Sequence, residues 1–169
     1  SSTNKGTGDL KLGAVTDTGG KNITLTNEKG SILENAANSS LLTSAGTISL
    51  LAGNTTKGAT SVGTLANAIN PQGGTLQATA GTGGIFIDEA DTATISTVTT
   101  TGAGNIKIQN LADGTLSTSG VVSSTGAGSI DLLSFGALSL GADVTSVAGN
   151  ITLAADTNSN DATGASQFE

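Results

Sequence analysis

Carboxylates are the side chains in this sequence whose type and spacing come closest to supporting catalysis. The chain has no histidine, arginine, cysteine, tyrosine or tryptophan, which excludes Ser–His and Cys–His nucleophile pairs. Asp88, Glu89 and Asp91 cluster after an apolar–x–apolar step. A glycosidase needs two carboxylates about 5 to 9.5 Å apart across a sugar cleft, and only Phe86 offers a nearby aromatic platform. We therefore expect a solvated acidic turn here and no catalytic residue.

A second group of oxygen-bearing side chains lies near the C-terminus. The run Asp156-Thr157-Asn158-Ser159-Asn160-Asp161 places them at alternate positions, as the start of a calcium loop does. It lacks the glycine at the sixth position and the closing bidentate acid of that loop. The candidate metal ligands are Asp156, Asn158, Asn160 and Asp161. The alternative is a polar tail over residues 157–169, in a protein that requires no cofactor.

The elements that would position these residues recur along the chain. Seven times a small or polar residue, usually after a glycine, leads into an apolar–x–apolar step. The anchors Ile85, Ile106, Ile130 and Ile151 follow one another at intervals of 21, 24 and 21 residues. A recurrence of this length is typical of solenoids, and the two-residue period within each step indicates strands.

The repeat predicts an all-β parallel β-helix of about seven coils with three short strands each, in one domain over residues 1–169. Each strand would pair with its equivalent one coil away, at a spacing of about 4.8 Å. Two sets of corner residues follow. Glycines would allow positive φ or close backbone approach: Gly46, Gly74, Gly104, Gly128 and Gly149. Small polar side chains before the anchors would hydrogen-bond between coils: Asn22, Thr47, Thr75, Asn105, Ser129 and Asn150.

One segment breaks the rhythm. Residues 53–74 read as an excursion from the coil, with a single helical turn ended by Pro71. Insertions in solenoids map to loops on one face, which is often the binding face. The alternative is a tolerated surface loop.

Charge narrows the classes of partner. The net charge is −7, with six lysines as the only basic residues, which disfavours nucleic acid and anionic membrane surfaces. No stretch approaches the roughly 20 apolar residues of a membrane helix, so we expect no membrane insertion. No signal peptide is visible at Ser1, so we expect a secreted form to be a processed product or an excised segment.

Two surface patterns have both a functional and a structural interpretation. Lys107 and Asp131 each follow an anchor, so they would stack on adjacent coils, as a ligand contact or as an exposed ion pair. Threonine is abundant, as in the run 97–101, and an ice-binding face would repeat Thr-x-Thr in successive coils. The steps that we align do not repeat it, so we expect no regular array.

The recurring Gly-[Asn/Ser]-Ile-x-[Ile/Leu] step, and above all residues 137–155, resembles the repeats of filamentous-haemagglutinin-like bacterial exoproteins. These include two-partner-secretion adhesins and related giant surface proteins. The resemblance extends from about Asp9 to Ala155. It implies a right-handed parallel β-helix, export across a bacterial outer membrane, and a role as a fibrous stalk or adhesin. No secretion domain is visible, and no functional residue transfers.

These patterns together predict a non-enzymatic extracellular protein, secreted or at the cell surface, that serves as a β-helical stalk or fibre subunit. Its short polar ends do not look like caps, so we expect it to associate end to end with other copies or with flanking β-helix repeats. Cell-surface glycans or a host or neighbouring cell are further expected partners. The alternative function is a module that binds surface carbohydrate, or less favourably ice, through a Thr/Asn-rich face or residues 53–74. A carbohydrate-cleaving enzyme acting through Asp88 and Glu89 ranks third.

Overall fold

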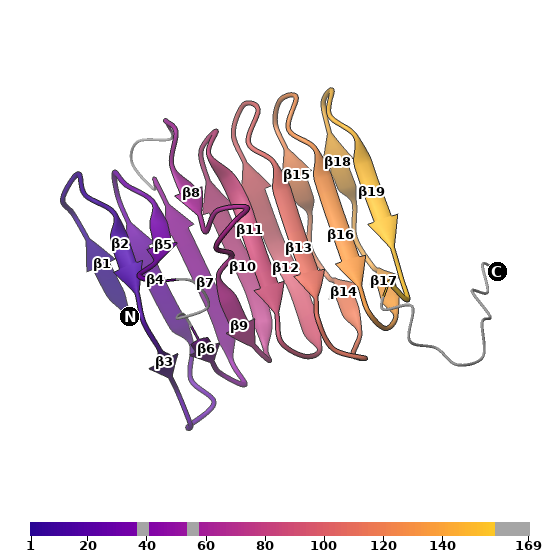
Figure 1. The fold of residues 1–169 in the computed structure, drawn as a ribbon, viewed down its shortest axis with the longest axis horizontal. Coiled ribbons are helices and arrows are strands. Elements are labelled where there is room, and N and C mark those ends of the chain that lie inside the picture. Colours follow the sequence, from indigo (N-terminus) through magenta and orange to yellow (C-terminus); the bar gives the residue numbers. More distant parts are fainter. Residues whose placement is uncertain (37–40, 54–57, 158–169) are drawn as a thin grey trace.

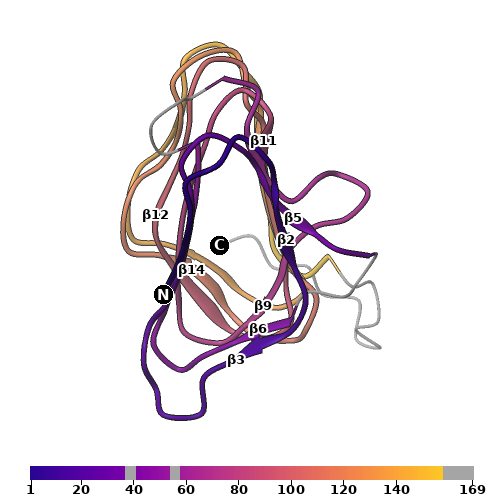
Figure 2. The same cartoon turned by 90° about the vertical axis from the view of Figure 1, so that its left-hand side faces the viewer.

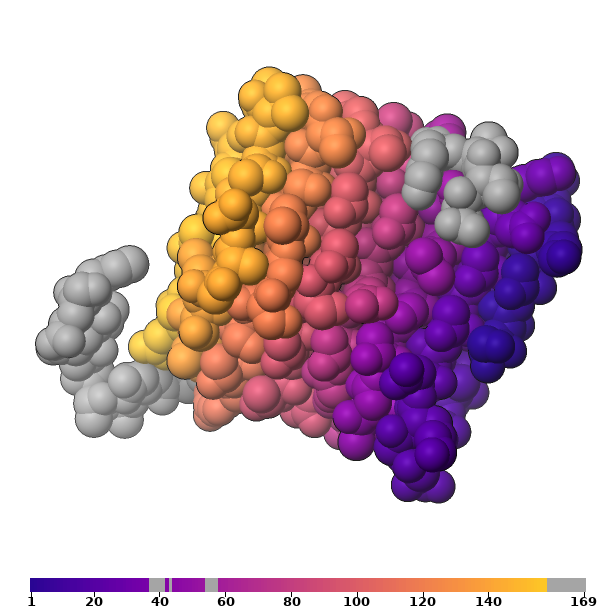
Figure 3. All heavy atoms as spheres, turned by 180° about the vertical axis from the view of Figure 1, so that it is seen from behind, coloured from indigo at the N-terminus to yellow at the C-terminus, as the bar shows by residue number. Residues whose placement is uncertain are grey.

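The computed structural model describes residues 1–36, 41–53 and 58–157. They form an all-β parallel solenoid of about six turns, and the described part of the chain contains no helix. The coils rise in order from the N-terminus to the last strand (Figure 1). Seen along the axis, the coils enclose one narrow core (Figure 2), and from behind they pack as parallel bands (Figure 3).

Within the described residues, nineteen short strands build three parallel sheets. Sheet 1 contains β1 (Ser2–Asn4), β4 (Ile23–Asn27), β7 (Thr47–Ala52), β10 (Thr75–Ala80), β12 (Ala93–Thr100), β14 (Leu116–Thr118), β15 (Val122–Ser124), β17 (Leu138–Leu140) and β18 (Val144–Ser146). Sheet 2 contains β2 (Leu10–Leu12), β5 (Ile32–Glu34), β8 (Ser61–Val62), β11 (Gly84–Glu89), β13 (Ile106–Asn110), β16 (Ile130–Ser134) and β19 (Ile151–Ala154). Sheet 3 contains β3 (Val15–Thr16), β6 (Leu41–Thr43) and β9 (Asn70–Gln72).

The predicted count of about seven three-stranded coils differs slightly from this arrangement. Sheet 3 ends at β9, and after it the third side of the coil is a turn. The first strand of the coil then divides, because β12 pairs with both β14 and β15. The division starts as an irregularity opposite Leu76/Gln77 in the pairing of β10 with β12. One coil later, the chain at this place turns through Gly120, where an added Cβ would lie 1.4 Å from the Ser96 carbonyl oxygen.

Columns of apolar side chains fill the core. The predicted anchors Ile85, Ile106, Ile130 and Ile151 pair residue for residue on successive strands of sheet 2, as expected. The recurring apolar–x–apolar steps do not all enter the same sheet. Ile23, Ile48 and Leu76 form their own column in sheet 1. Both sheets use the same step, so the sequence repeat alone did not separate them.

Polar side chains at the corners link one coil to the next, as predicted for two of the six candidates. Asn22 Oδ1 accepts a hydrogen bond from the Thr47 N–H, and Asn105 Oδ1 accepts one from the Ser129 N–H, both at 2.9 Å. The same link recurs at residues that the sequence analysis missed: Asp9 accepts from the Ser31 N–H, Ser31 from the Ser61 N–H and Thr92 from the Thr115 N–H. The residue before a step therefore often caps the backbone of the following coil.

Replacing Asn105 with alanine should lower the free energy of unfolding by about 1 kcal/mol, because the Ser129 N–H loses its acceptor but stays near water. Urea denaturation measures this change. The matched control is Asn150→Ala. Asn150 is exposed and precedes Ile151 at the equivalent corner two coils later, and we expect no significant change in stability there. A loss at Asn150 equal to that at Asn105 would contradict the linking role.

Close backbone approach explains most of the corner glycines. An added Cβ would lie 2.5 Å from the Gly81 carbonyl oxygen at Gly104, 2.0 Å from that of Gly104 at Gly128, and 2.2 Å from that of Gly128 at Gly149. Of the five predicted corner glycines, only Gly74 has a positive φ, at 79°. These glycines therefore form a ladder in which each makes room for the carbonyl of the one before.

The departure from the coil is narrower than the predicted 53–74 segment. This segment contains β8 and β9, which pair with sheets 2 and 3. Pro71 lies in β9 and ends no helix. The exposed part with its own turn is residues 64–68, where Leu65 is 73% exposed, and this loop projects from the cross-section near β5 (Figure 2).

Candidate functional site

The alternation of β11 separates the acidic residues that the sequence places together. Asp88 lies on the outer side of the strand and is half-buried, whereas Glu89 points inward and is fully buried. Asp91 follows in the turn before β12. The expected solvated turn is therefore wrong for Glu89, and the three acids do not converge on a shared outer surface as the two carboxylates of a glycosidase would.

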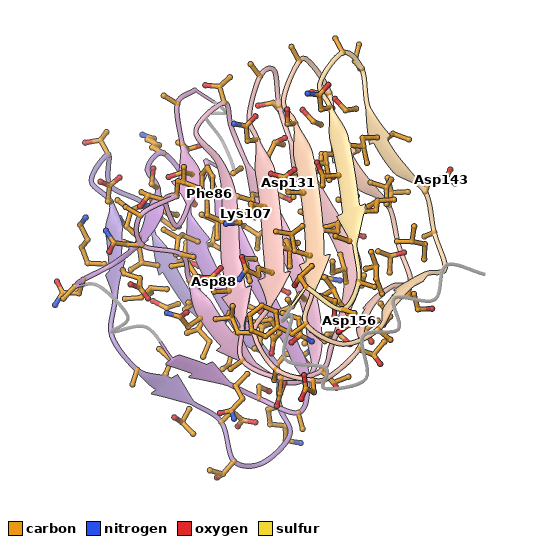
Figure 4. The ribbon with its side chains drawn as sticks, turned by 45° about the vertical axis from the view of Figure 1, so that its right-hand side comes forward. Phe86, Asp88, Lys107, Asp131, Asp143 and Asp156 are labelled. Atoms are coloured by element: carbon orange, nitrogen blue, oxygen red, sulfur yellow. The ribbon has the colours of Figure 1, made fainter. Side chains whose placement is uncertain are left out.

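Outer residues of sheet 2 form a short row near Asp88, in which two of the side chains are charged. Phe86, Lys107 and Asp131 occupy equivalent positions on β11, β13 and β16, and Figure 4 shows them on successive strands. Burial raises the pKa of the Asp88 carboxyl, the charge of Lys107 opposes this rise, and the charge of Glu34 adds to it. The predicted stacking of Lys107 on Asp131 is confirmed.

Glu89 is held by the backbone of two coils. Its Oε1 accepts hydrogen bonds from the Gly73 N–H at 3.0 Å and the Asp91 N–H at 3.4 Å. Burial is the main reason that the pKa of Glu89 rises from 4.5 to about 8. The neighbouring Asp91 carboxyl raises the pKa of Glu89 further, while the hydrogen bond from the Gly73 N–H lowers it. A carboxyl with a pKa of about 8 is mostly protonated at pH 7.

The predicted calcium site lies mostly outside the described residues. Asp156 is exposed and has a φ of 51°, and Figure 4 places it at the end of the last coil. Asn158, Asn160 and Asp161 are outside the described chain, so this site stays a prediction. Over residues 1–36, 41–53 and 58–157, no group of three or more acidic, histidine or cysteine side chains could hold a metal ion.

The outer face of sheet 1 carries rows of Thr and Ser hydroxyl groups. None of its described strands contains a charged residue. Register aligns one row of Thr47, Thr75, Thr94, Ser117 and Ser139, and part of another of Thr79, Thr99, Ser123 and Thr145. These rows were not predicted, but they do not form the Thr-x-Thr array of an ice-binding face, because Thr47, Thr75 and Thr94 are followed two residues later by Ser49, Gln77 and Ser96.

The last described coil, formed by β17, β18 and β19, exposes apolar side chains whose equivalents in the preceding coil are buried. Ile130 and Leu132 are fully buried, but their equivalents Ile151 and Leu153 are 41% and 39% exposed. No described strand pairs with the outer edges of β17 and β19. This end therefore offers both apolar columns and free backbone groups to a further coil.

Comparison with known proteins found no family model, no curated protein and no solved structure that matches the chain. No helix within the described residues is long and apolar enough to span a membrane.

Proposed function

We propose that the chain is a non-enzymatic, right-handed β-solenoid that serves as an extracellular stalk or fibre subunit and associates end to end. The observation that carries this proposal is the exposure of apolar side chains on the last coil of the described residues. Ile151 and Leu153 continue columns that are fully buried one coil earlier. Covering such side chains is favourable by about 25 cal/mol per Å² of apolar surface removed from water.

The first coil fits this surface. Leu10 and Leu12 of β2 stand at the start of sheet 2, at the anchor position and two residues after it, as Ile151 and Leu153 do in β19. A second copy placed with β2 on β19 would continue both columns with apolar residues. Backbone pairing at the free strand edges would add the hydrogen bonds of a parallel ladder.

Charge along the axis also favours head-to-tail contact. Residues 1–57 hold five of the six lysines and four acids, and residues 58–169 hold one lysine and nine acids. The two parts therefore carry net charges of +1 and −8. A head-to-tail contact brings opposite signs together, whereas contact between two C-terminal ends joins like charges.

The proposal is tested by sedimentation velocity and electron microscopy of the purified chain over a concentration series, with and without calcium. The wild type should form rods that lengthen as concentration rises, and the Ile151→Lys/Leu153→Lys double variant should remain single-length. The matched control is Thr152→Lys, which adds a charge on the outer side of the same strand and should still assemble. Single-length rods of the wild type at every concentration would refute end-to-end association.

The neutral hydroxyl face of sheet 1 supports a second candidate function, the binding of an uncharged surface carbohydrate. Its rows offer donors and acceptors at regular intervals, and some hydroxyls already bond along a row, as Thr94 does with Ser117 at 3.1 Å. A glycan array should show binding that Thr99→Lys removes and Thr152→Lys leaves intact. Thermal hysteresis without glycan binding would indicate ice, and neither signal would dismiss this function.

A further inference from the structure

The corner formed by Gly73, Glu89, Asp91 and Asn110 lies where the solenoid changes its cross-section. Gly73 directly follows β9, the last strand of sheet 3, and Glu89 ends β11 in the next coil. Asn110 ends β13 and pairs with Glu89 in register. We call this group the acid corner. It connects the three-sheet part of the solenoid to the part in which sheet 3 is absent.

All of the buried side-chain atoms without a hydrogen-bond partner in the described chain belong to the acid corner. They are Glu89 Oε2, Asp91 Oδ1 and Asn110 Nδ2. Glu89 and Asn110 are both fully buried. Unpaired polar atoms inside a protein are costly, so a hydrogen bond between two of these atoms would stabilise the corner.

No positive charge of the described chain enters this corner. Asn110, the neighbour of Glu89 in its column, is neutral, and its Oδ1 already accepts from the Ala112 N–H at 2.8 Å. Lys107 lies on the outer row, and its charge affects the pKa of Asp88. The charge of Glu34 also affects the pKa of Asp88. Asp113 is exposed in the turn of the following coil. An ionised Glu89, fully buried beside the half-buried Asp91, would thus lack a compensating cation, which is unfavourable.

We propose that Glu89 and Asp91 share a single proton, which is carried on Glu89 Oε2 and donated to Asp91 Oδ1. This shared proton stabilises the folded acid corner. The proton gives both unpartnered oxygens a hydrogen-bond partner, because a protonated carboxyl is a donor. Oε1 remains free to accept from the Gly73 and Asp91 N–H groups. The raised pKa of Glu89, about 8, agrees with a proton that is retained at neutral pH.

The sign of the pH dependence follows directly. The pKa of Glu89 is higher in the folded protein than the ordinary 4.5, so the folded state keeps a proton that the unfolded state releases. Stability from this group is complete below about pH 4.5 and is lost as the pH rises to about 8. Within this window the unfolding equilibrium constant should rise about tenfold per pH unit from this group alone.

The test is Glu89→Gln, which replaces the protonated acid by a neutral amide that still donates to Asp91 and accepts from Gly73. Urea unfolding of the wild type, E89Q and the outer-face control D131N should be compared from pH 4 to pH 9. In the wild type, the slope of the unfolding free energy against pH should include the release of about one proton on unfolding, and in E89Q this contribution should be absent. We also expect E89Q to be more stable than the wild type at pH 8. D131N should keep the wild-type slope.

A direct measurement keeps the proposal falsifiable if E89Q does not fold. Carboxyl ¹³C spectra of protein labelled at its four glutamates should contain one resonance that titrates near pH 8. Asp91→Asn should move this titration to lower pH, because the negative neighbour is removed. Four ordinary titrations below pH 6, or an unchanged slope in E89Q, would overturn the proposal. So would stabilisation by 5 mM CaCl₂ at pH 6 that E89Q abolishes, since a metal ion would then hold the pair.

Discussion

Replacing Gly128 with alanine should destabilise the solenoid by about 3 kcal/mol or more, at or above the upper end of the usual cost of overpacking. The new Cβ would lie 2.0 Å from the Gly104 carbonyl oxygen and 2.5 Å from Ser124 Oγ. The carbonyl belongs to the backbone of the preceding coil, so relief requires the two coils to separate. Such a separation would strain the pairing of Ile106 with Ile130 just beyond the corner. Urea denaturation followed by far-ultraviolet circular dichroism measures the loss.

Gly13→Ala is the matched control for Gly128→Ala. No atom lies within 4 Å of a Cβ built at Gly13, and its φ is not in the left-handed region. The change should be neutral or stabilise the protein by up to ~1 kcal/mol through the unfolded chain. Equal stabilities of the two variants would show that contact between coils does not select the corner glycines.

Ile106→Ala should cost roughly 2–5 kcal/mol, the range for truncating a buried isoleucine. Ile106 is fully buried, and it pairs with Ile85 on one side and Ile130 on the other. The strand spacing on both sides is fixed by the backbone ladder, so the coils cannot close over the cavity. The cost should therefore fall in the upper half of this range. The same denaturation experiment measures it.

Ile151→Ala provides an internal comparison, because Ile151 ends the same column at 41% exposure. Its truncation in dilute protein should cost about 1 kcal/mol or less. If copies stack on the last coil, the cost should grow with protein concentration, because assembly then buries this side chain. Equal losses of stability for Ile106→Ala and Ile151→Ala in dilute protein would contradict the conclusion that the column is exposed at Ile151.

Periodicity alone was enough to predict the parallel solenoid and the Ile85–Ile106–Ile130–Ile151 column, because stacked positions must repeat at the length of one coil. It was not enough to separate the sheets. Thr47 and Asn105 precede similar steps, yet they lie in different sheets. The length of each corner, which sets the sheet that a step enters, depends on contacts with the neighbouring coil. For this reason the hydroxyl rows of sheet 1 were missed.

The buried state of Glu89 had a signal in the sequence. Ile85, Ile87 and Glu89 share the phase of the two-residue alternation, so continuing the pattern by one step would have placed the carboxylate inside. The acidic composition of residues 88–91 suggested a surface turn instead. The contacts with Gly73 and Asn110 could not be predicted, because they join residues of three coils across a change in cross-section.

The stacking of strands along the axis also determines how the molecule would respond to tension. A pull applied at the two ends acts on the hydrogen bonds of one coil at a time, so the coils separate in sequence as in a zipper. Each coil between Ile85 and Ile151, of 21 to 24 residues, releases roughly 70–80 Å of extended chain. A solenoid pulled in this way would lengthen in regular steps at modest force and dissipate a sudden load, whereas a structure sheared across all its strands would resist and then fail at once.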